Sequence, residues 1–241
     1  MITFKHVTKT YDGNIGLKDV SLDIGDGEFV FLVGPSGAGK STFIKLIIKE
    51  IDADEGEIQV GDYRVDTLSS REVPQLRRKI GMVFQDFRLL PKKTVFENVA
   101  FAMEILHRSP KTIRRRVPEV LKMVGIEDKS KRYPQELSAG EQQRVAIARA
   151  IVNSPKVVIA DEPTGNLDPK TADDIMHLLD AVNMSGTTVV MVTHAKDIVN
   201  KWNKRVVAIE KGCIVRDGFG SYGFRKKPEQ KGGRDHAKNH V

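Results

Sequence analysis

The sequence predicts an α/β fold with a mostly parallel central sheet. Three short apolar runs, at residues 29–33, 157–160 and 188–192, are too uniformly hydrophobic for half-exposed strands and too short for typical helices. We therefore expect three buried parallel strands. Each run is followed at once, or nearly so, by a glycine-rich or polar segment. Ligands bind beyond the carboxyl ends of strands in open α/β sheets, so these segments are expected to converge on one functional edge.

The composition favours one globular unit. A chain of 241 residues, 40% of them apolar, can form one sizeable core with an inserted subdomain, but two independent domains would be crowded. No run approaches the roughly 18 consecutive apolar residues of a membrane-spanning helix, and no signal peptide is recognisable. The single cysteine, Cys213, suits a reducing compartment. The net charge of +7 indicates either an anionic partner (nucleic acid, nucleotide or acidic lipid) or a solvated basic surface.

A phosphate-binding loop follows the first predicted strand. Residues 34–41 match G-x-x-x-x-G-K-[ST] without a mismatch and precede a helix expected from Ser41 to about Lys49. Glycines allow backbone N–H groups to curl around phosphate oxygens, and the helix N-terminus adds its positive dipole end. A tight turn without this function would not require the Lys-Ser pair. The predicted nucleotide-binding residues here are Gly34, Pro35, Ser36, Gly37, Ala38, Gly39, Lys40, Ser41 and Thr42.

An acidic pair ends the second predicted strand. Lys40 is expected to contact the β and γ phosphates, while the Ser41 hydroxyl and the Asp161 carboxylate can ligate Mg²⁺. Glu162, one residue further on, can act as the general base that activates a water for attack on the γ-phosphate. An exposed strand-to-loop turn is the alternative interpretation of this pair, which the upstream phosphate loop disfavours.

Residues 137–144, Leu-Ser-Ala-Gly-Glu-Gln-Gln-Arg, precede an amphipathic helix. Ser138 and Gly140 present a hydroxyl and backbone N–H groups at the helix start, which makes either a second anion site or an ordinary N-cap. The segment resembles the signature motif of ABC ATPases, usually Leu-Ser-Gly-Gly-Gln. The resemblance implies a RecA-like core, an N-terminal antiparallel β part and an inserted helical subdomain. It also implies a head-to-tail homodimer in the ATP-bound state, in which one copy contacts ATP on the other through Ser138, Ala139, Gly140 and Glu141.

Further positions match the ABC pattern in order and spacing. By this resemblance Tyr11 stacks on adenine, Gln85 contacts Mg²⁺ and the attacking water, and Asp168 belongs to the D-loop. His194 matches the switch histidine that contacts the γ-phosphate. The expected catalytic residues are thus Glu162, His194 and Gln85, the expected metal ligands are Ser41, Gln85 and Asp161, and the cofactors are ATP and Mg²⁺.

The signature departs from the usual motif at two positions. Ala139 replaces a glycine and Glu141 replaces a glutamine. Glycine allows a close backbone approach to phosphate, so we hypothesise that the Ala139 methyl group crowds the γ-phosphate or restricts φ and slows turnover without abolishing ATP binding.

The domain organisation is expected to be one ATPase domain, residues 1–223, followed by a basic, disordered tail, residues 224–241. Residues of about 87–155 read as the inserted helical subdomain, with helices at 94–106 and 111–124; Pro118 should kink or restart the second. The tail is either a solvated appendage or weakly attracted to anionic lipids.

Three segments, residues 71–78, 84–90 and 114–117, resemble the FtsE family of cell-division ATPases, and residues 91–95 resemble its Gram-positive members. The resemblance runs from residue 1 to about 223. It implies a membrane partner of the FtsX type and peripheral contact with the cytoplasmic face of the inner membrane. ATP cycling would then signal through FtsX to regulate cell-wall hydrolases in cell division, rather than drive transport.

Three other functions are weighed against this interpretation. A lipoprotein- or macrolide-type export ATPase shares every catalytic motif and differs in its membrane partner. A DNA- or ribosome-associated ABC ATPase would need a second ATPase unit or a long coiled coil, for which the chain has no room, so no specific nucleic-acid partner is expected. A regulatory module without turnover is disfavoured because Glu162 and His194 are both present.

Overall fold

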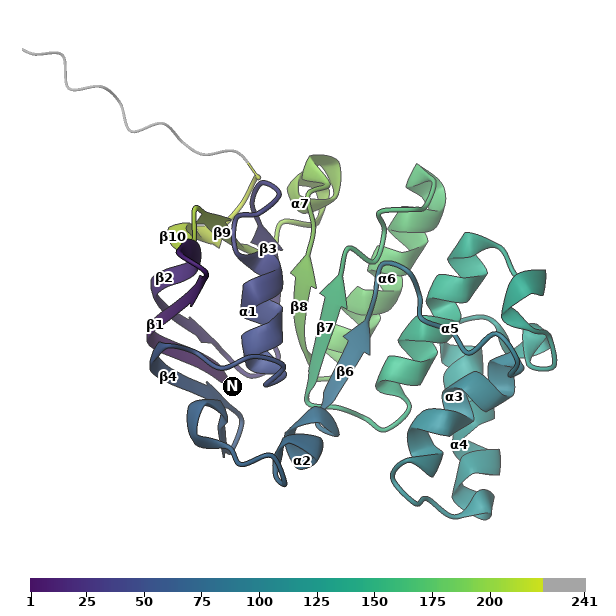
Figure 1. Cartoon of the computed structure of the whole chain (residues 1–241). Helices are drawn as coiled ribbons and strands as arrows, with labels where there is room; N and C mark the ends of the chain where they lie inside the picture. Colours follow the sequence, from purple (N-terminus) through teal and green to yellow (C-terminus); the bar gives the residue numbers. More distant parts are fainter. Residues whose placement is uncertain (223–241) are drawn as a thin grey trace, which may run out of the picture.

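A computed structural model describes residues 1–222 (Figure 1). The predicted tail lies outside the described residues. The strands are β1 (Ile2–Tyr11), β2 (Asn14–Ile24), β3 (Phe29–Val33), β4 (Glu55–Val60), β5 (Tyr63–Arg64), β6 (Ile80–Val83), β7 (Val157–Asp161), β8 (Thr188–Val192), β9 (Arg205–Glu210) and β10 (Cys213–Phe219). The α-helices are α1 (Lys40–Ile47), α2 (Val73–Arg77), α3 (Val95–Glu104), α4 (Pro110–Met123), α5 (Ala139–Ile151), α6 (Pro169–Met184) and α7 (Lys196–Trp202).

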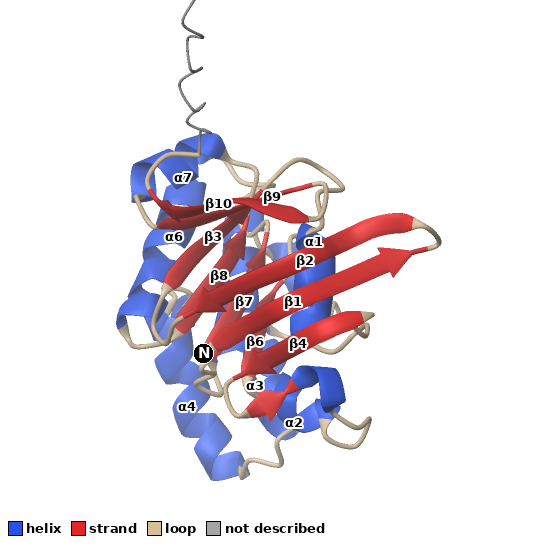
Figure 2. Ribbon diagram, turned by 90° about the vertical axis from the view of Figure 1, so that its left-hand side faces the viewer, coloured by secondary structure: helices blue, strands red, loops and turns tan. Residues whose placement is uncertain are grey.

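The strands form two sheets on either side of α1. The larger sheet has the order β10-β9-β3-β8-β7-β6, and all its neighbours pair in parallel except β9 and β10. The smaller sheet, β2-β1-β4-β5, is antiparallel. Figure 2 shows this smaller sheet lying across α1, with the larger sheet behind. The predicted fold, a mostly parallel sheet with an N-terminal antiparallel part, is confirmed.

The central strands are apolar throughout because both faces of the larger sheet are covered. Along β3, Phe29, Phe31 and Val33 enter the core beneath the helices α3 to α6, whereas Val30 and Leu32 enter a second core around α1. β7 and β8 alternate between the two cores in the same way. Every residue of β3 and β8 is buried. This arrangement explains why these strands show no polar alternation in the sequence.

Aromatic packing attaches the antiparallel sheet to α1, and a polar contact holds the chain before β4 to the same sheet. The rings of Phe4 in β1 and Phe43 in α1 stack with centroids 4.4 Å apart, and both side chains are buried. At the far end of β1, the Asp54 carboxylate accepts hydrogen bonds from Lys9 Nζ at 2.7 Å and from the Thr10 backbone N–H at 2.7 Å. These contacts hold the chain that leads into β4 against β1.

In the chain, helices α3, α4 and α5 come after β6 and before β7, at the place expected for the helical subdomain. Figure 1 shows them gathered beside the β6 edge of the larger sheet. The prediction that Pro118 restarts the second helix is wrong, because α4 runs unbroken from Pro110 to Met123. A proline within a helix costs about 3 kcal/mol. Burial of Ile113, Val117 and Leu121 on one face of α4 offsets that cost.

No helix within residues 1–222 is long and apolar enough to cross a membrane.

Candidate functional site

The loop between β3 and α1 depends on glycines for its shape. Gly37 and Gly39 have φ values of 73° and 115°, a region that favours glycine. A Cβ added to Gly39 would lie 2.3 Å from the carbonyl oxygen of Gly16. Residue 39 therefore has to be glycine for conformational and for steric reasons, and the backbone can turn sharply before α1.

Lys40, the first residue of α1, points back over this loop. Its Nζ donates hydrogen bonds to the carbonyl oxygens of Gly34 at 2.8 Å and of Pro35 at 2.9 Å. Burial lowers the pKa of Lys40, whereas the carboxylates of Glu162 and Asp161 act to raise it. These neutral carbonyl partners can be exchanged for phosphate oxygens, which attract an ammonium group more strongly.

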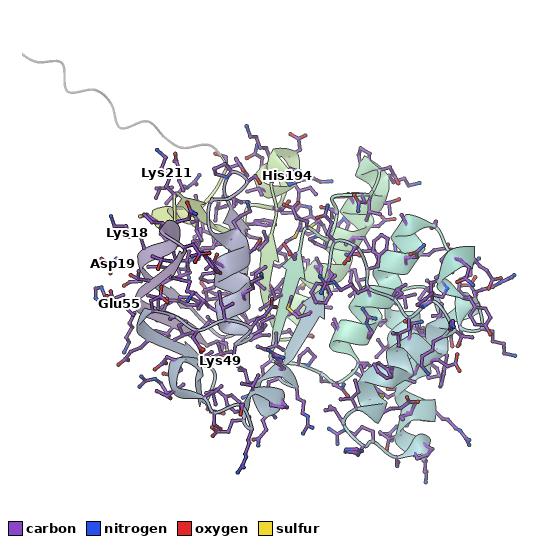
Figure 3. The ribbon with its side chains drawn as sticks, viewed as in Figure 1. Lys18, Asp19, Lys49, Glu55, His194 and Lys211 are labelled. Atoms are coloured by element: carbon purple, nitrogen blue, oxygen red, sulfur yellow. The ribbon has the colours of Figure 1, made fainter. Side chains whose placement is uncertain are left out.

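One polar cavity of about 640 Å³ lies at the carboxyl ends of β3, β7 and β8. The expected convergence of the three segments on one edge is confirmed. Figure 3 shows His194 at this edge, where β8 leads towards α7. The cavity is lined by Gly34, Pro35, Ser36, Gly37, Lys40, Ser41, Gln85, Asp161, Glu162, Val192, His194, Lys196 and Tyr222.

Glu162 and His194 are paired within this cavity. The His194 Nδ1 atom lies 2.7 Å from Glu162 Oε2. The Glu162 side chain is 16% exposed and that of His194 is 68% exposed, so the pair extends from the sheet edge towards solvent. Glu162 adopts a left-handed φ of 49°, and its N–H donates to the Val192 carbonyl at 2.9 Å. The strained backbone and the hydrogen bond aim this carboxylate into the cavity rather than along the strand.

Asp161 ends β7 in a half-buried position. Burial raises the pKa of its carboxyl, as does the neighbouring Glu162 charge, whereas Lys40 and Arg88 oppose the shift. Ser41, Gln85 and Asp161 line the same cavity and offer a hydroxyl, an amide and a carboxylate oxygen, which are ligand types that Mg²⁺ accepts. Within residues 1–222 no group of three histidine, cysteine or acidic residues could hold a metal ion. A metal there would thus need phosphate or water oxygens as well.

The loop after β6 carries Gln85 into the cavity and is held from two sides. Asn166 Nδ2 donates to the Gln85 carbonyl at 3.4 Å. Arg149, from α5, donates to the carbonyls of Phe87 at 2.8 Å and of Arg88 at 2.6 Å. Phe87 and Arg88 both have positive φ values, of 57° and 47°. Arg149 therefore stabilises a turn that the backbone alone disfavours, and nothing in the local sequence indicated this role.

The remaining predicted site residues do not line this cavity. Ala38, Gly39 and Thr42 shape the loop and α1 behind it, and the Tyr11 hydroxyl lies 3.4 Å from Thr42 Oγ1. Asp168 caps α6 by accepting from the Lys170 and Thr171 N–H groups, both at 3.1 Å. The signature residues Ser138, Ala139, Gly140 and Glu141 form the start of α5, outside this cavity.

The start of α5 is a complete capping box. Ser138 Oγ accepts from the Glu141 N–H at 3.3 Å, and Glu141 Oε2 accepts from the Ser138 N–H at 2.8 Å. A Cβ on Gly140 would lie 2.4 Å from the Thr171 methyl group, so this glycine permits α5 to approach α6. Ala139 has no positive φ, so its backbone conformation here does not require a glycine.

Sequence reasoning missed two polar residues of the cavity, Lys196 and Tyr222. Lys196 follows His194 by two residues, and this closeness in the sequence could have indicated that it lies near the same site. Tyr222 lies at the end of the described chain and had no motif to mark it.

Comparison with known proteins decides the family. The ABC transporter family matches residues 17–165. The cell division ATP-binding protein FtsE of Bacillus subtilis is 56% identical over 92% of this chain and 99% of its own length. The FtsE protein of Streptococcus pneumoniae is 52% identical over 93% and 98% of the two chains. This chain belongs to the FtsE family of ABC ATPases. It is therefore an ATP-binding and ATP-hydrolysing protein.

Two solved structures of ABC cassettes have the same fold as this FtsE-family chain. One is a dimeric ATP-binding cassette in a post-hydrolysis state bound to ADP and Pi. It aligns with a TM-score of 0.82 at 40% identity, covering 93% of this chain and all of the other. A cassette from Clostridium perfringens, cbiO1, part of the ABC transporter complex cbiONQ, aligns with a TM-score of 0.84 at 33% identity over 90% and 87% of the two chains.

Proposed function

We propose that residues 1–223 form the ATPase subunit of an FtsEX-like complex in cell division. The observation that carries the proposal is the cavity in which Lys40, Glu162 and His194 meet. It combines a cation for the phosphates, a carboxylate that can accept a proton and an imidazole that orients the carboxylate at 2.7 Å. The 52–56% identity to FtsE proteins supports the same role.

Hydrolysis follows from these positions. ATP phosphates enter the loop, and the Lys40 ammonium turns from the Gly34 and Pro35 carbonyls to the β and γ phosphates. Glu162 accepts a proton from water as the water oxygen bonds to the γ-phosphorus and the bond to the ADP oxygen breaks. His194 holds the carboxylate and contacts the departing phosphate. A Mg²⁺ held by Ser41, Gln85 and Asp161 would neutralise charge on the phosphates.

We further propose that two copies assemble head to tail when ATP is bound. The N-terminus of α5, with Ser138 as its cap, is an anion-binding end that lies outside the cavity of its own chain. A symmetric pair brings each such helix end to the other copy's phosphates. The alignment with a dimeric cassette that contains ADP and Pi supports this assembly.

The membrane partner is proposed to dock in a groove between α2, β6 and α3. This groove, of about 610 Å³, has an apolar surface that includes Phe101, 36% exposed, and Ile105, 50% exposed. Arg77 and Arg88 also line it, and within residues 1–222 no acidic residue does. A short amphipathic helix with carboxylates at its edge fits these walls. We propose that an FtsX-like protein supplies it, which places this subunit at the cytoplasmic face of the membrane and connects ATP turnover to cell-wall hydrolases.

Glu162→Gln tests the enzymatic part. The variant should lose 10²- to 10⁴-fold in phosphate release, the usual contribution of a general base, yet still bind ATP. In complex with its membrane partner it should be trapped as an ATP-bound dimer, with Ser138 of one copy near the nucleotide of the other. Full turnover by the variant would contradict the role of Glu162, and a trapped complex without Ser138 at that place would contradict the dimer.

Capture from detergent-solubilised membranes tests the partner. Ile105→Asp should abolish capture of an FtsX-type protein, whereas Met123→Asp, at an exposed residue of α4 outside the groove, should retain it. Capture of an unrelated permease by the unmodified chain would instead favour the lipoprotein or macrolide exporter.

A further inference from the structure

The chain after β10 folds back onto the nucleotide cavity. Arg216, in β10, donates to the carbonyl of Ser221 and, at 3.3 Å, to that of Phe219. The Tyr222 N–H then donates to Asn200 Oδ1 on α7 at 2.7 Å. In Figure 1 the described chain ends beside the loop that precedes α1. These hydrogen bonds fix the turn that carries Tyr222 to the cavity.

The Tyr222 side chain is positioned by the surrounding residues. It is half-buried, packs against the core that includes α6 and α7, and lines the cavity together with Glu162 and His194. The Lys196 ammonium lies 5.6 Å from the centre of its ring. Phe219, three residues earlier, is 73% exposed by contrast. Tyr222 is thus a component of the cavity wall, unlike the neighbouring aromatic residue.

The phenol is a neutral hydrogen-bonding group at this place. Burial raises the pKa of Tyr222, the Glu162 carboxylate raises it further, and a hydrogen bond from the Gly34 backbone acts in the opposite direction. A raised pKa means that the phenol keeps its proton at neutral pH. The phenol proton therefore remains available to an acceptor in the cavity.

We propose that Tyr222 is a residue of the ATP site whose O–H donates to the phosphates of bound nucleotide and whose backbone couples that nucleotide to α7. The cavity that Tyr222 lines is the phosphate end of the proposed site, since Lys40 and Ser41 also line it. α7 follows His194 directly and carries both Lys196 and Asn200. A nucleotide that engages the phenol thereby also engages the helix next to His194. This inference rests on the proposed placement of ATP in this cavity.

Binding of ATP and AMP to the full chain tests the phenol. Tyr222→Phe keeps the ring and removes the hydroxyl, so ATP binding should weaken about tenfold, as for one lost hydrogen bond to a charged group, with AMP binding almost unchanged. Tyr63→Phe, the same change in the antiparallel sheet, is the matched control and should bind like the parent. Lys40→Ala should lose ATP binding. If Lys40→Ala loses ATP binding while Tyr222→Phe binds ATP normally, the proposed role of Tyr222 is wrong. If Lys40→Ala and Tyr222→Phe both bind ATP normally, the proposed placement of ATP in this cavity is wrong.

The only tryptophan of the chain reports on the coupling. Trp202 ends α7 and meets the His177 ring edge-on with centroids 4.8 Å apart. Saturating ATP should change Trp202 fluorescence in the parent and in Tyr63→Phe, and the change should be lost in Tyr222→Ala. An unresponsive Trp202 in the parent, or an undiminished response in a folded Tyr222→Ala variant, would refute the link to α7.

Discussion

Arg149→Met is expected to destabilise the loop that carries Gln85 and to slow hydrolysis. Arg149 reaches that loop from α5 and donates to the Phe87 and Arg88 carbonyls at 2.8 and 2.6 Å. Each hydrogen bond from a charged donor contributes about 1.5–3 kcal/mol to stability. Each of the two left-handed residues that they hold costs about 1–2 kcal/mol. Without the guanidinium, that backbone cost is no longer compensated.

The opposing effect is the desolvation of the guanidinium. Burial lowers the pKa of Arg149, because removing the guanidinium from water disfavours its charged form. Methionine has a similar length and removes both the charge and the bonds. We therefore expect a net loss of about 2–3 kcal/mol in the free energy of unfolding, below the sum of the two bonds.

Urea unfolding and ATPase kinetics together check this expectation. Arg115→Met, at an exposed position of α4, is the control and should change stability by less than about 0.5 kcal/mol. In Arg149→Met we expect kcat to fall more than ATP affinity, because Gln85 loses its placement while the phosphate loop is untouched. A stability loss under about 0.5 kcal/mol together with an unchanged kcat would refute the reasoning.

Three further outcomes are expected. Hydrogen bonds from Lys9 and from the backbone beside it lower the pKa of Asp54 from 3.8 to about 2, so its contribution to stability is complete above pH 3.8 and is lost as the pH falls towards 2. Acid titration of folding should be shallower in this range for Asp54→Asn. Gly140→Ala should destabilise the chain by about 1–3 kcal/mol in urea unfolding, because its Cβ would lie 2.4 Å from Thr171. Ala139→Gly should change stability by about 1 kcal/mol or less. An unchanged turnover rate in Ala139→Gly would reject our hypothesis that the Ala139 methyl group slows turnover. EDTA should stop phosphate release and added Mg²⁺ should restore it, with no effect on the unfolding of the nucleotide-free chain.

The parts of the fold that follow from local chemistry were predicted from the sequence. The strands at residues 29–33 and 188–192 have the predicted bounds, because strands buried on both faces must be apolar at every position. The phosphate loop was recognisable because its pattern glycines, Gly34 and Gly39, stand where a Cβ would lie 2.2 and 2.3 Å from backbone oxygen atoms. In contrast, the expectation that Pro118 restarts a helix was wrong, because a rule based on the local sequence ignores the tertiary packing of α4.

Contacts between distant segments had no such local requirement. Arg149, on α5, holds the loop that carries Gln85. In the sequence nothing distinguishes it from an arginine on the surface of a helix. Tyr222 reaches the cavity that Glu162 lines because β10 pairs with β9 at the sheet edge and because Asn200 holds the turn that follows. Both contacts depend on the relative placement of whole elements, which the packing of two cores decides. Motifs thus identify the backbone that can bind phosphate, whereas the side chains that complete the cavity are found only after the elements have been placed in space.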